Sequence, residues 1–438
     1  MTHSDANPIR EHIDNGPFSP LQIAVVVIGF LLNFVDGFDV VAMSVAAPAL
    51  TEDWGITPAQ KGYILSAALV GMTLGAMFLA PFADKVGRRS ILIFATILIG
   101  VSMIVTGLIP QSVELMMLVR IISGLGIGII FANSAAIGTE FAPERYRNLA
   151  VTLIVMGYPF GAMLVGPFAN VVIPAQGWQM LFIYGGIFTL LMTMVIYFFL
   201  PESVEYLATK PDKSGSSLEK INTILKRMKR PALDRLPVKT DEDLKAANVG
   251  SLFKQGLGGQ TTGLWTIYFL GFLSVYFLLS WVPTLFVESG YTRGEGIRAL
   301  TVNNMGAVLG IIAIGLTTTR IKLAKPIAFF FVSAGLLLSA IFLFKPQEIL
   351  VLNFLIFLVG FMQQGAFTAM YALAARVYPT TIRATGIGWS AGLGRTGAIL
   401  SPIMAGYLVA AGWSMYSLFL LFGIPLIVAG FIVFWYRH

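Results

Sequence analysis

Long apolar stretches separated by short polar connections run through most of the chain. Each stretch holds about 20 residues or more, the length that a helix needs to cross the hydrocarbon core of a bilayer. We therefore expect an all-α membrane protein with twelve transmembrane helices, at residues 21–50, 60–83, 90–109, 113–140, 148–172, 178–200, 262–287, 297–318, 326–344, 348–375, 384–409 and 414–436.

One long polar segment divides these helices into six and six. We expect an N-terminal tail at 1–20, a six-helix bundle at 21–200, a linker at 201–261 and a second six-helix bundle at 262–438. The halves also repeat weakly, because identities cluster at one constant offset: Gly124 with Gly360, Pro143 with Pro379, Arg147 with Arg383, Gly161 with Gly397, Ala162 with Ala398, and Leu164 with Leu400. Two parallel membrane repeats would produce this pattern.

The linker contains a short amphipathic pattern. Ser216 and Glu219 have the spacing of a capping box. Apolar residues follow at helical spacing, with lysines and arginines opposite them: Leu218, Ile221, Leu225 and Met228. A basic amphipathic helix of this kind typically lies against the inner leaflet of a membrane. A loosely ordered linker is the alternative.

Composition narrows the chemistry. The chain is 56% hydrophobic and 12% charged, has no cysteine, and carries its three histidines near its ends. Disulfides, thiolate metal sites and buried histidine relays are therefore excluded. We expect no metal and no cofactor, and any proton chemistry within the membrane falls to carboxylates.

Charge distribution predicts the orientation. Most of the 29 lysines and arginines fall in the tail, the linker and the loops on the same side as the termini. The positive-inside rule then places both termini in the cytoplasm of a cell with an inner (cytoplasmic) membrane. The net charge of +7 follows from this bias, so we expect contact with the lipid bilayer and no nucleic-acid partner.

Two acids interrupt the first span, in the stretch NFVDGFDVVAMSV. Asp36 and Asp39 are three residues apart, on helix faces about 60° from each other. An aspartate at mid-membrane costs ~2.5–3.5 kcal/mol on insertion scales, and burial beside a second carboxylate favours proton uptake. We expect the pair to couple proton movement to transport, or alternatively to serve as structural acids. Gly37 between them would permit close backbone approach or local unwinding.

Two arginines also lie within spans. Arg120 in the fourth span cannot lose its charge and therefore needs an anion, either Asp36, Asp39 or a substrate carboxylate. Arg395 lies midway along the eleventh span and is the candidate partner of a substrate carboxylate in the second half. A purely structural ion pair is the alternative for each.

Several motifs resemble a known family. The loop APFADKVGRRS, residues 80–90, is similar to the signature between spans two and three of the major facilitator superfamily, with Ala80 where a glycine is usual. RIISGLGIG, residues 120–128, resembles the superfamily's arginine-and-glycine motif in span four. DGFD at 36–39, EFAPERYR after span four and GLGRTGA in span eleven resemble the aromatic acid:proton symporter family. That family imports benzoate-like and hydroxybenzoate-like carboxylates together with protons.

The resemblance implies the major facilitator fold and a gate at the signature loop. Asp84 would meet the cytoplasmic end of span eleven, and a basic residue of the loop would pair with an acid at the end of span four. Glu140 is the matching acid, and Arg88 is our choice of base ahead of Arg89. Taken alone, the two arginines could merely reflect the positive-inside bias.

An aromatic acid also needs groups that hold its ring. Asp36, Asp39, Arg120 and Arg395 are the ionic candidates for its site. The candidates for ring stacking and for reading ring hydroxyls are Tyr158, Tyr276, Trp281, Tyr371, Trp389, Gln363 and Gln364. Aromatic residues in spans are more often lipid-facing or interfacial.

The expected function is uptake of a small aromatic carboxylate with protons, by a monomer that works through alternating access. A transporter of a non-aromatic organic acid is one alternative. A proton-linked exporter is another, since GYPFGAMLVGPFAN in span five matches part of an exporter pattern. Nothing in the sequence supports a membrane enzyme, and a receptor would not explain both the embedded charges and the gating loop.

Overall fold

The computed structural model describes residues 8–14, 17–209, 216–236, 249–254, 256–318, 321–379 and 382–436. Within them the chain is helical, and twelve helices are long and apolar enough to cross a membrane. They are α2 (Pro20–Trp54), α3 (Pro58–Leu74) with its continuation to Val86, α5 (Arg88–Leu108), α6 (Val113–Phe141), α7 (Arg147–Gln176), α8 (Trp178–Phe199), α11 (Gly258–Glu288), α12 (Arg293–Thr317), α13 (Ala324–Phe344), α14 (Ile349–Val377), α15 (Arg383–Ala410) and α16 (Met415–Phe434). The twelve predicted spans are confirmed.

The twelve helices form two bundles of six with the same internal pairing. In the first half α2 packs on α7, α3 on α6 and α5 on α8, and in the second half α11 packs on α15, α12 on α14 and α13 on α16. Matched glycines create matched close contacts. A Cβ on Gly161 would lie 2.0 Å from the carbonyl oxygen of Phe34, and a Cβ on Gly397 would lie 2.4 Å from that of Phe269. The repeat predicted from sequence identities is therefore a repeat of packing.

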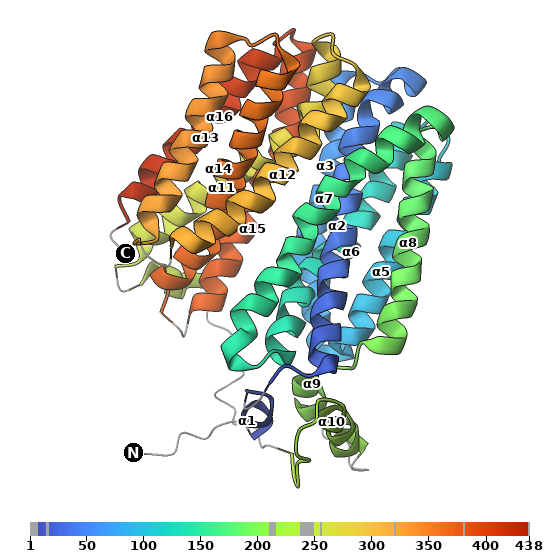
Figure 1. Cartoon of the computed structure of the whole chain (residues 1–438), viewed down its shortest axis with the longest axis vertical. Helices are drawn as coiled ribbons and strands as arrows, with labels where there is room; N and C mark the ends of the chain where they lie inside the picture. Colours follow the sequence, from blue (N-terminus) through green and yellow to red (C-terminus); the bar gives the residue numbers. More distant parts are fainter. Residues whose placement is uncertain are drawn as a thin grey trace.

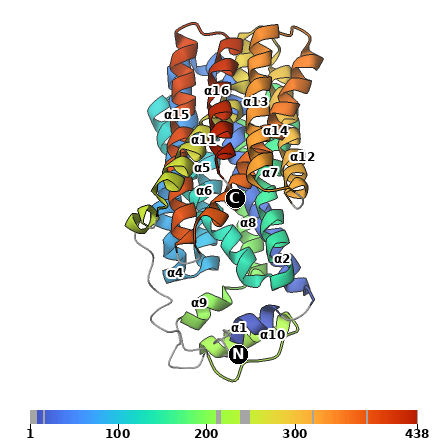
Figure 2. The same ribbon diagram turned by 90° about the vertical axis from the view of Figure 1, so that its left-hand side faces the viewer.

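The two halves lie side by side (Figure 1). Three short helices, α1 (Pro8–Asp14), α9 (Val204–Thr209) and α10 (Ser216–Arg227), sit beyond one end of the first half. Figure 2 shows them in the same place after a quarter turn. We call these three helices the cap, the neighbouring end of the bundle the cap face, and the opposite end the far face.

The cap corrects the prediction that α10 lies on lipid. Ile221, Leu225 and Met228 are fully buried in the protein, together with Ile9 and Ile13 of α1. Helix α10 packs on α9 and lies beside α1 (Figure 2). Its apolar face is therefore covered by the chain itself, so it has no face left to insert into a bilayer.

A break in helix geometry occurs in the second span and not at Gly37. After α3 the chain passes through a π-helical segment, η1 (Gly75–Leu79), a 3₁₀ turn, η2 (Ala80–Phe82), and the short α4 (Ala83–Val86). Helix α2 runs unbroken through Gly37, where a Cβ would lie only 1.9 Å from the carbonyl oxygen of Tyr158. Close approach, and not unwinding, is therefore what this glycine permits.

Candidate functional site

Asp39 and Arg120 form an ion pair inside the first half. Arg120 donates from Nη1 to Asp39 Oδ1 at 2.7 Å and from Nη2 to the Asp39 backbone oxygen at 3.2 Å. Ser123 donates to the other carboxylate oxygen at 2.7 Å. Both charged side chains are essentially inaccessible, so the pair is closed on itself and offers no exposed surface to a substrate in this conformation.

Asp36 faces different surroundings. Its side chain is fully buried, and neither carboxylate oxygen has a hydrogen-bond partner among the described residues. A buried anion without donors is far more costly than the neutral acid, because nothing replaces the lost hydration. The geometry therefore favours a protonated Asp36 in this conformation.

Arg395 is the positive counterpart across the interface between the halves. Its side chain is 7% exposed, and it forms no ion pair with any described residue. The guanidinium lies over the ring of Phe131, 4.8 Å from its centroid, and Phe131 belongs to the first half. A buried, unpaired guanidinium is a site for an incoming anion.

Three tyrosines connect these charges. Tyr158 of α7 and Tyr276 of α11 lie near each other across the interface, and both lie within electrostatic range of Asp36 and Arg395. Tyr371 of α14 lies near Arg395 and Tyr276. We call Asp36, Tyr158, Tyr276, Tyr371 and Arg395 the central cluster. It combines a fixed cation, an ionisable acid and aromatic surface in one place.

A small cavity adjoins the central cluster at Tyr158. Amide side chains from two helices of the second half line it, namely Asn303 and Asn304 of α12 and Gln363 and Gln364 of α14. Its volume of about 10 Å³ has room for about one water molecule. We call it the amide pocket.

Two of the predicted ring contacts lie elsewhere. The indole of Trp281 is fully buried, donates to the Pro402 oxygen at 3.1 Å and lies 5.4 Å from Lys61 Nζ, toward the far face. Trp389 is 39% exposed and stacks on Trp265 near the ends of α11 and α15 at the cap face. The structure therefore does not bring either tryptophan into the central cluster: the first is enclosed by packing and the second is displaced along its helix.

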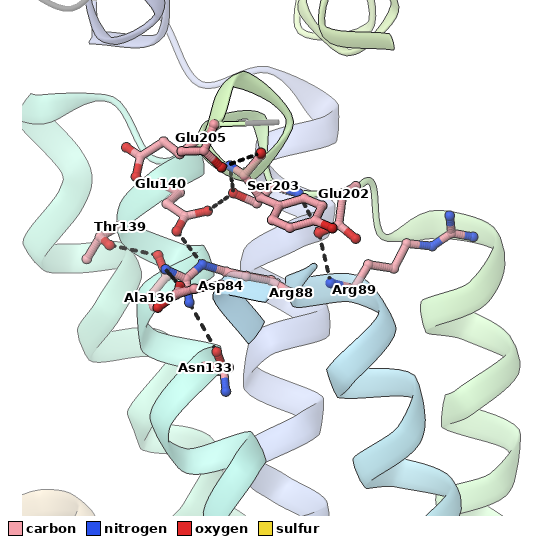
Figure 3. A network of polar contacts seen from close by, with 12 residues as sticks. Asp84, Arg88, Arg89, Asn133, Ala136, Thr139, Glu140, Glu202, Ser203 and Glu205 are labelled. Atoms are coloured by element: carbon pink, nitrogen blue, oxygen red, sulfur yellow. Dashed lines mark hydrogen bonds and ion pairs between the residues drawn. The ribbon is translucent and has the colours of Figure 1, made fainter. Parts of the chain in front are cut away.

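The signature loop builds a polar network at the cap face (Figure 3). Arg88 pairs through Nε with Glu140 and donates from Nη1 to Asn133 Oδ1 at 3.1 Å. Ser203, which follows α8, donates to the second oxygen of Glu140. The resemblance implied contact between the loop base and the acid that ends span four, and Arg88 and Glu140 make that contact.

Gly87 and Arg89 attach the same loop to the end of the sixth span. Gly87 has a φ of 98°, a value that favours glycine. A Cβ there would also lie 2.3 Å from Glu202 Oε2. The backbone N–H of Arg89 donates to Glu202 Oε1 at 3.1 Å (Figure 3). Its guanidinium donates to the backbone oxygen of Tyr197. Arg89 therefore anchors α5 to α8 and does not join the Glu140 pair.

Asp84 does not meet span eleven in this conformation. Its side chain is 77% exposed, and its ionic partner is Arg88 of the same loop, at 3.8 Å. No hydrogen bond or ion pair joins described residues of the two halves at the cap face. The contact that the resemblance implied between Asp84 and span eleven is therefore not formed among the described residues in this conformation.

The halves are instead joined at the far face. Lys61, which is 3% exposed, pairs with Glu288 at 3.4 Å, and the hydroxyls of Tyr63 and Tyr407 are 2.6 Å apart. The remaining contacts are those of Ser44 with the backbone oxygens of Leu279 and Ser280, Ser66 with that of Ile399, and Arg293 with Glu52. Among the described residues, the hydrogen bonds and ion pairs that join the two halves all lie on the far-face side.

Sequence reasoning missed several of these residues. Asn303 and Asn304 were visible as consecutive amides within an apolar span, a signal as clear as Gln363 and Gln364. Lys61 lies at the start of the second predicted span, and no motif marks it. Its role depends on which helix of the other half lies opposite, and no local pattern reveals that.

Comparison with known proteins identifies the family. The Major Facilitator Superfamily profile matches residues 29–355. The 4-hydroxybenzoate transporter PcaK of Pseudomonas aeruginosa is 36% identical over 93% of this chain and 90% of its own length. Two further relatives are each 30% identical over 96% of this chain. They are the gallate transporter of Pseudomonas putida, matched over 93% of its own length, and the benzoate transport protein of Acinetobacter baylyi, matched over 90% of its own length.

A solved structure shows the same fold. The structure titled as the inward open conformation of the xylose transporter XylE from E. coli superposes with a TM-score of 0.73. It covers 95% of this chain and 96% of its own, at 17% sequence identity. With twelve membrane-spanning helices in two packed repeats and these relatives, the chain belongs to the Major Facilitator Superfamily of transporters and is not an enzyme.

Proposed function

We propose that this protein takes up a small aromatic carboxylate together with protons, by rocking its two halves around the central cluster. The observation that carries the proposal is a buried acid, Asp36, and a buried base, Arg395, on different halves. Neither has an ionic partner among the described residues, and both lie near Tyr158 and Tyr276. Relatives named as transporters of 4-hydroxybenzoate, gallate and benzoate support the aromatic class.

Charge balance supplies the coupling. Arg395 can be neutralised either by an ionised Asp36 or by a substrate carboxylate, and both anions together would leave one unpaired. Substrate therefore binds best when Asp36 is protonated, and Asp36 releases its proton most easily after the substrate has left. Each ligand favours the state that the other favours, which is the thermodynamic requirement for coupling.

The remaining ionic groups have supporting roles in this proposal. The Asp39–Arg120 pair holds α2 against α6 and fixes the position of Asp36 one turn away. Asp84, Arg88, Arg89 and Glu140 form the gate at the cap face, and Asp84 would contact α15 when that face closes. Breaking and remaking these contacts would accompany each cycle.

The proposal includes an orientation. The protein would act as a monomer in the cytoplasmic (inner) membrane, with both termini and the cap in the cytoplasm, as the distribution of lysine and arginine predicts. The far face, where hydrogen bonds and ion pairs join the halves, would then point away from the cytoplasm.

Uptake into vesicles that contain the purified protein tests the proposal. Labelled benzoate, 4-hydroxybenzoate and a short aliphatic dicarboxylate would be offered with and without an imposed pH gradient. We expect the aromatic acids to accumulate only when the outside is more acidic. Uptake indifferent to the gradient would remove the proton from the mechanism, and preference for the dicarboxylate would remove the aromatic class.

The variant Asp36→Asn tests the coupling step. The amide mimics a permanently protonated acid, so exchange of labelled for unlabelled substrate should persist while accumulation driven by the pH gradient is lost. Asp14→Asn, which alters an acid paired with Arg147 next to the cap, is the matched control and should accumulate normally. Normal gradient-driven accumulation by Asp36→Asn would contradict the assignment.

A further inference from the structure

We propose that the amide pocket binds a ring hydroxyl of the substrate and thereby makes the transporter prefer hydroxylated aromatic acids to unsubstituted ones. The inference rests on the proposed function and adds a specificity-determining group to it. Its subject is the pocket lined by Asn303, Asn304, Gln363 and Gln364.

One donor in this region has no partner. Gln363 is 3% exposed, and its Nε2 has no hydrogen-bond partner among the described residues. Buried polar groups in folded proteins are nearly always paired, and exceptions often mark a place that a ligand or water fills. The side chain lines the pocket, so a group that enters there can accept its hydrogen bond.

The asparagines that line the same pocket can supply acceptors. Asn304 donates from Nδ2 to the Leu300 oxygen of its own helix at 3.0 Å, and Asn303 donates from Nδ2 to the Ile356 oxygen of α14 at 3.2 Å. Each asparagine uses one N–H in this bond, and no hydrogen bond among the described residues engages its carboxamide oxygen, which is left as an acceptor. A hydroxyl both donates and accepts, so it can satisfy Gln363 and one asparagine at the same time.

Size and charge exclude the other parts of the substrate. The pocket volume of about 10 Å³ admits a group the size of water and not a ring. No charged side chain lines the pocket, so a carboxylate would lose its hydration there without gaining a cation. The carboxylate therefore belongs with Arg395, and the ring lies against Tyr158, which borders both regions.

Competition measurements on reconstituted protein test the proposal. Inhibition of labelled 4-hydroxybenzoate uptake would be measured with benzoate and with its 2-, 3- and 4-hydroxy isomers. The key variant is Asn304→Leu, because the hydrogen bond that Asn304 donates lies within α12, so its loss removes no hydrogen bond between helices. Gln363→Met is the second variant, should the first fail to fold.

We expect Asn304→Leu to weaken binding of one hydroxylated isomer by about three- to tenfold, the effect of one hydrogen bond. Binding of benzoate should change less than twofold. The isomer that responds identifies the ring position facing the pocket. Asn353→Leu, a buried asparagine of α14 outside the pocket with an unpartnered Oδ1, is the matched control and should leave the ratio of hydroxybenzoate to benzoate affinity unchanged.

The outcomes separate this inference from the proposed function. If both pocket variants transport aromatic acids and keep the wild-type affinity ratio, the pocket does not read the hydroxyl although the proposed function stands. If the wild-type protein moves no aromatic acid, the proposed function falls, and the inference falls with it.

Discussion

At the scale of single residues, the buried charges have two kinds of surroundings. Asp39 and Arg120 satisfy each other and Ser123, whereas Asp36 and Arg395 have no ionic partner among the described residues. The Asp39–Arg120 pair joins α2 to α6. The unsatisfied groups face the interface between the halves, where a ligand can complete their coordination.

This difference predicts opposite effects on stability. Asp39→Asn leaves Arg120 buried without a counter-charge, and breaking a buried pair typically costs ~3–5 kcal/mol. Asp36→Asn removes an acid that has no donor, so it should change stability little. Thermal unfolding in detergent measures both, with the double variant Asp39→Asn/Arg120→Gln expected to unfold at a higher temperature than Asp39→Asn. Equal destabilisation by the two single variants would contradict this assignment.

The sequence predicts that the buried charged residues have a role, but it does not predict which of them pair with each other and which stay without an ionic partner. Asp36 and Asp39 are about 60° apart on a helix, and either face could meet α6. Only the packing of α2 against α6 and α7 decides that Asp39 meets Arg120 while Asp36 meets the interface. In this conformation Asp39 and Arg120 bind each other, and their contact with substrate stays a prediction.

At the scale of helices, small residues set the distances between neighbours. Gly37, Gly157 and Gly161 all bring α2 and α7 so close that an added Cβ would lie about 2 Å from a backbone oxygen of the other helix. Such small-residue stripes replace the hydrophobic effect as the means of packing helices in a membrane. The close packing at Gly37 also positions Tyr158 near Asp36.

Gly37→Ala is therefore expected to destabilise the first half. The methyl group would meet the Tyr158 oxygen at 1.9 Å, and overpacking of this kind typically costs ~1–3 kcal/mol. Gly315→Ala in α12 is the matched control, because nothing lies within 4 Å of its added Cβ. Relative to the unmodified protein, Gly37→Ala should lower the unfolding temperature more than Gly315→Ala does. If Gly37→Ala is as stable as the control, α2 and α7 are less closely packed than described.

The sequence predicts where the helices form, but it does not predict what covers their apolar faces. The apolar face of α10 follows from the spacing of Ile221, Leu225 and Met228, and a hydrophobic face does not reveal whether lipid or protein will cover it. Helix α9 packs on α10, and α1, which is distant in sequence, lies beside it. The π-helical break in the second span likewise has no local signal beyond glycine and proline near Ala80.

At the scale of the whole molecule, one sequence has to support two arrangements of its halves. The far face is closed by Lys61, Glu288 and neighbouring contacts, while the cap face has Asp84 exposed. The motifs predicted the cap-face gate only. The far-face contacts join residues that no motif marks, so the conformation could not be predicted from the sequence.

Lys61→Met should shift the population toward opening at the far face. Loss of a partly buried ion pair worth about 1 kcal/mol changes a two-state equilibrium by about fivefold. The chain has no cysteine, so Ser66→Cys provides a unique label behind the closed face. Its reaction with a membrane-impermeant maleimide should be about fivefold faster in the Lys61→Met background. Arg147→Gln, which breaks the ion pair with Asp14 beside the cap, is the control and should leave the labelling rate unchanged. An unchanged labelling rate in Lys61→Met would show that the Lys61–Glu288 pair does not hold the far face shut.

The lone guanidinium of Arg395 also decides which force can drive the cycle. With Asp36 ionised and no substrate, or with Asp36 protonated and a carboxylate bound, the centre of the protein carries no net charge. Moving an unbalanced charge through a membrane potential costs about 2.3 kcal/mol per 100 mV, so the two neutral forms are the ones that reorient readily. A carrier that shuttles only neutral forms is electrically silent, and acidity outside the cell, not voltage, would be its source of energy.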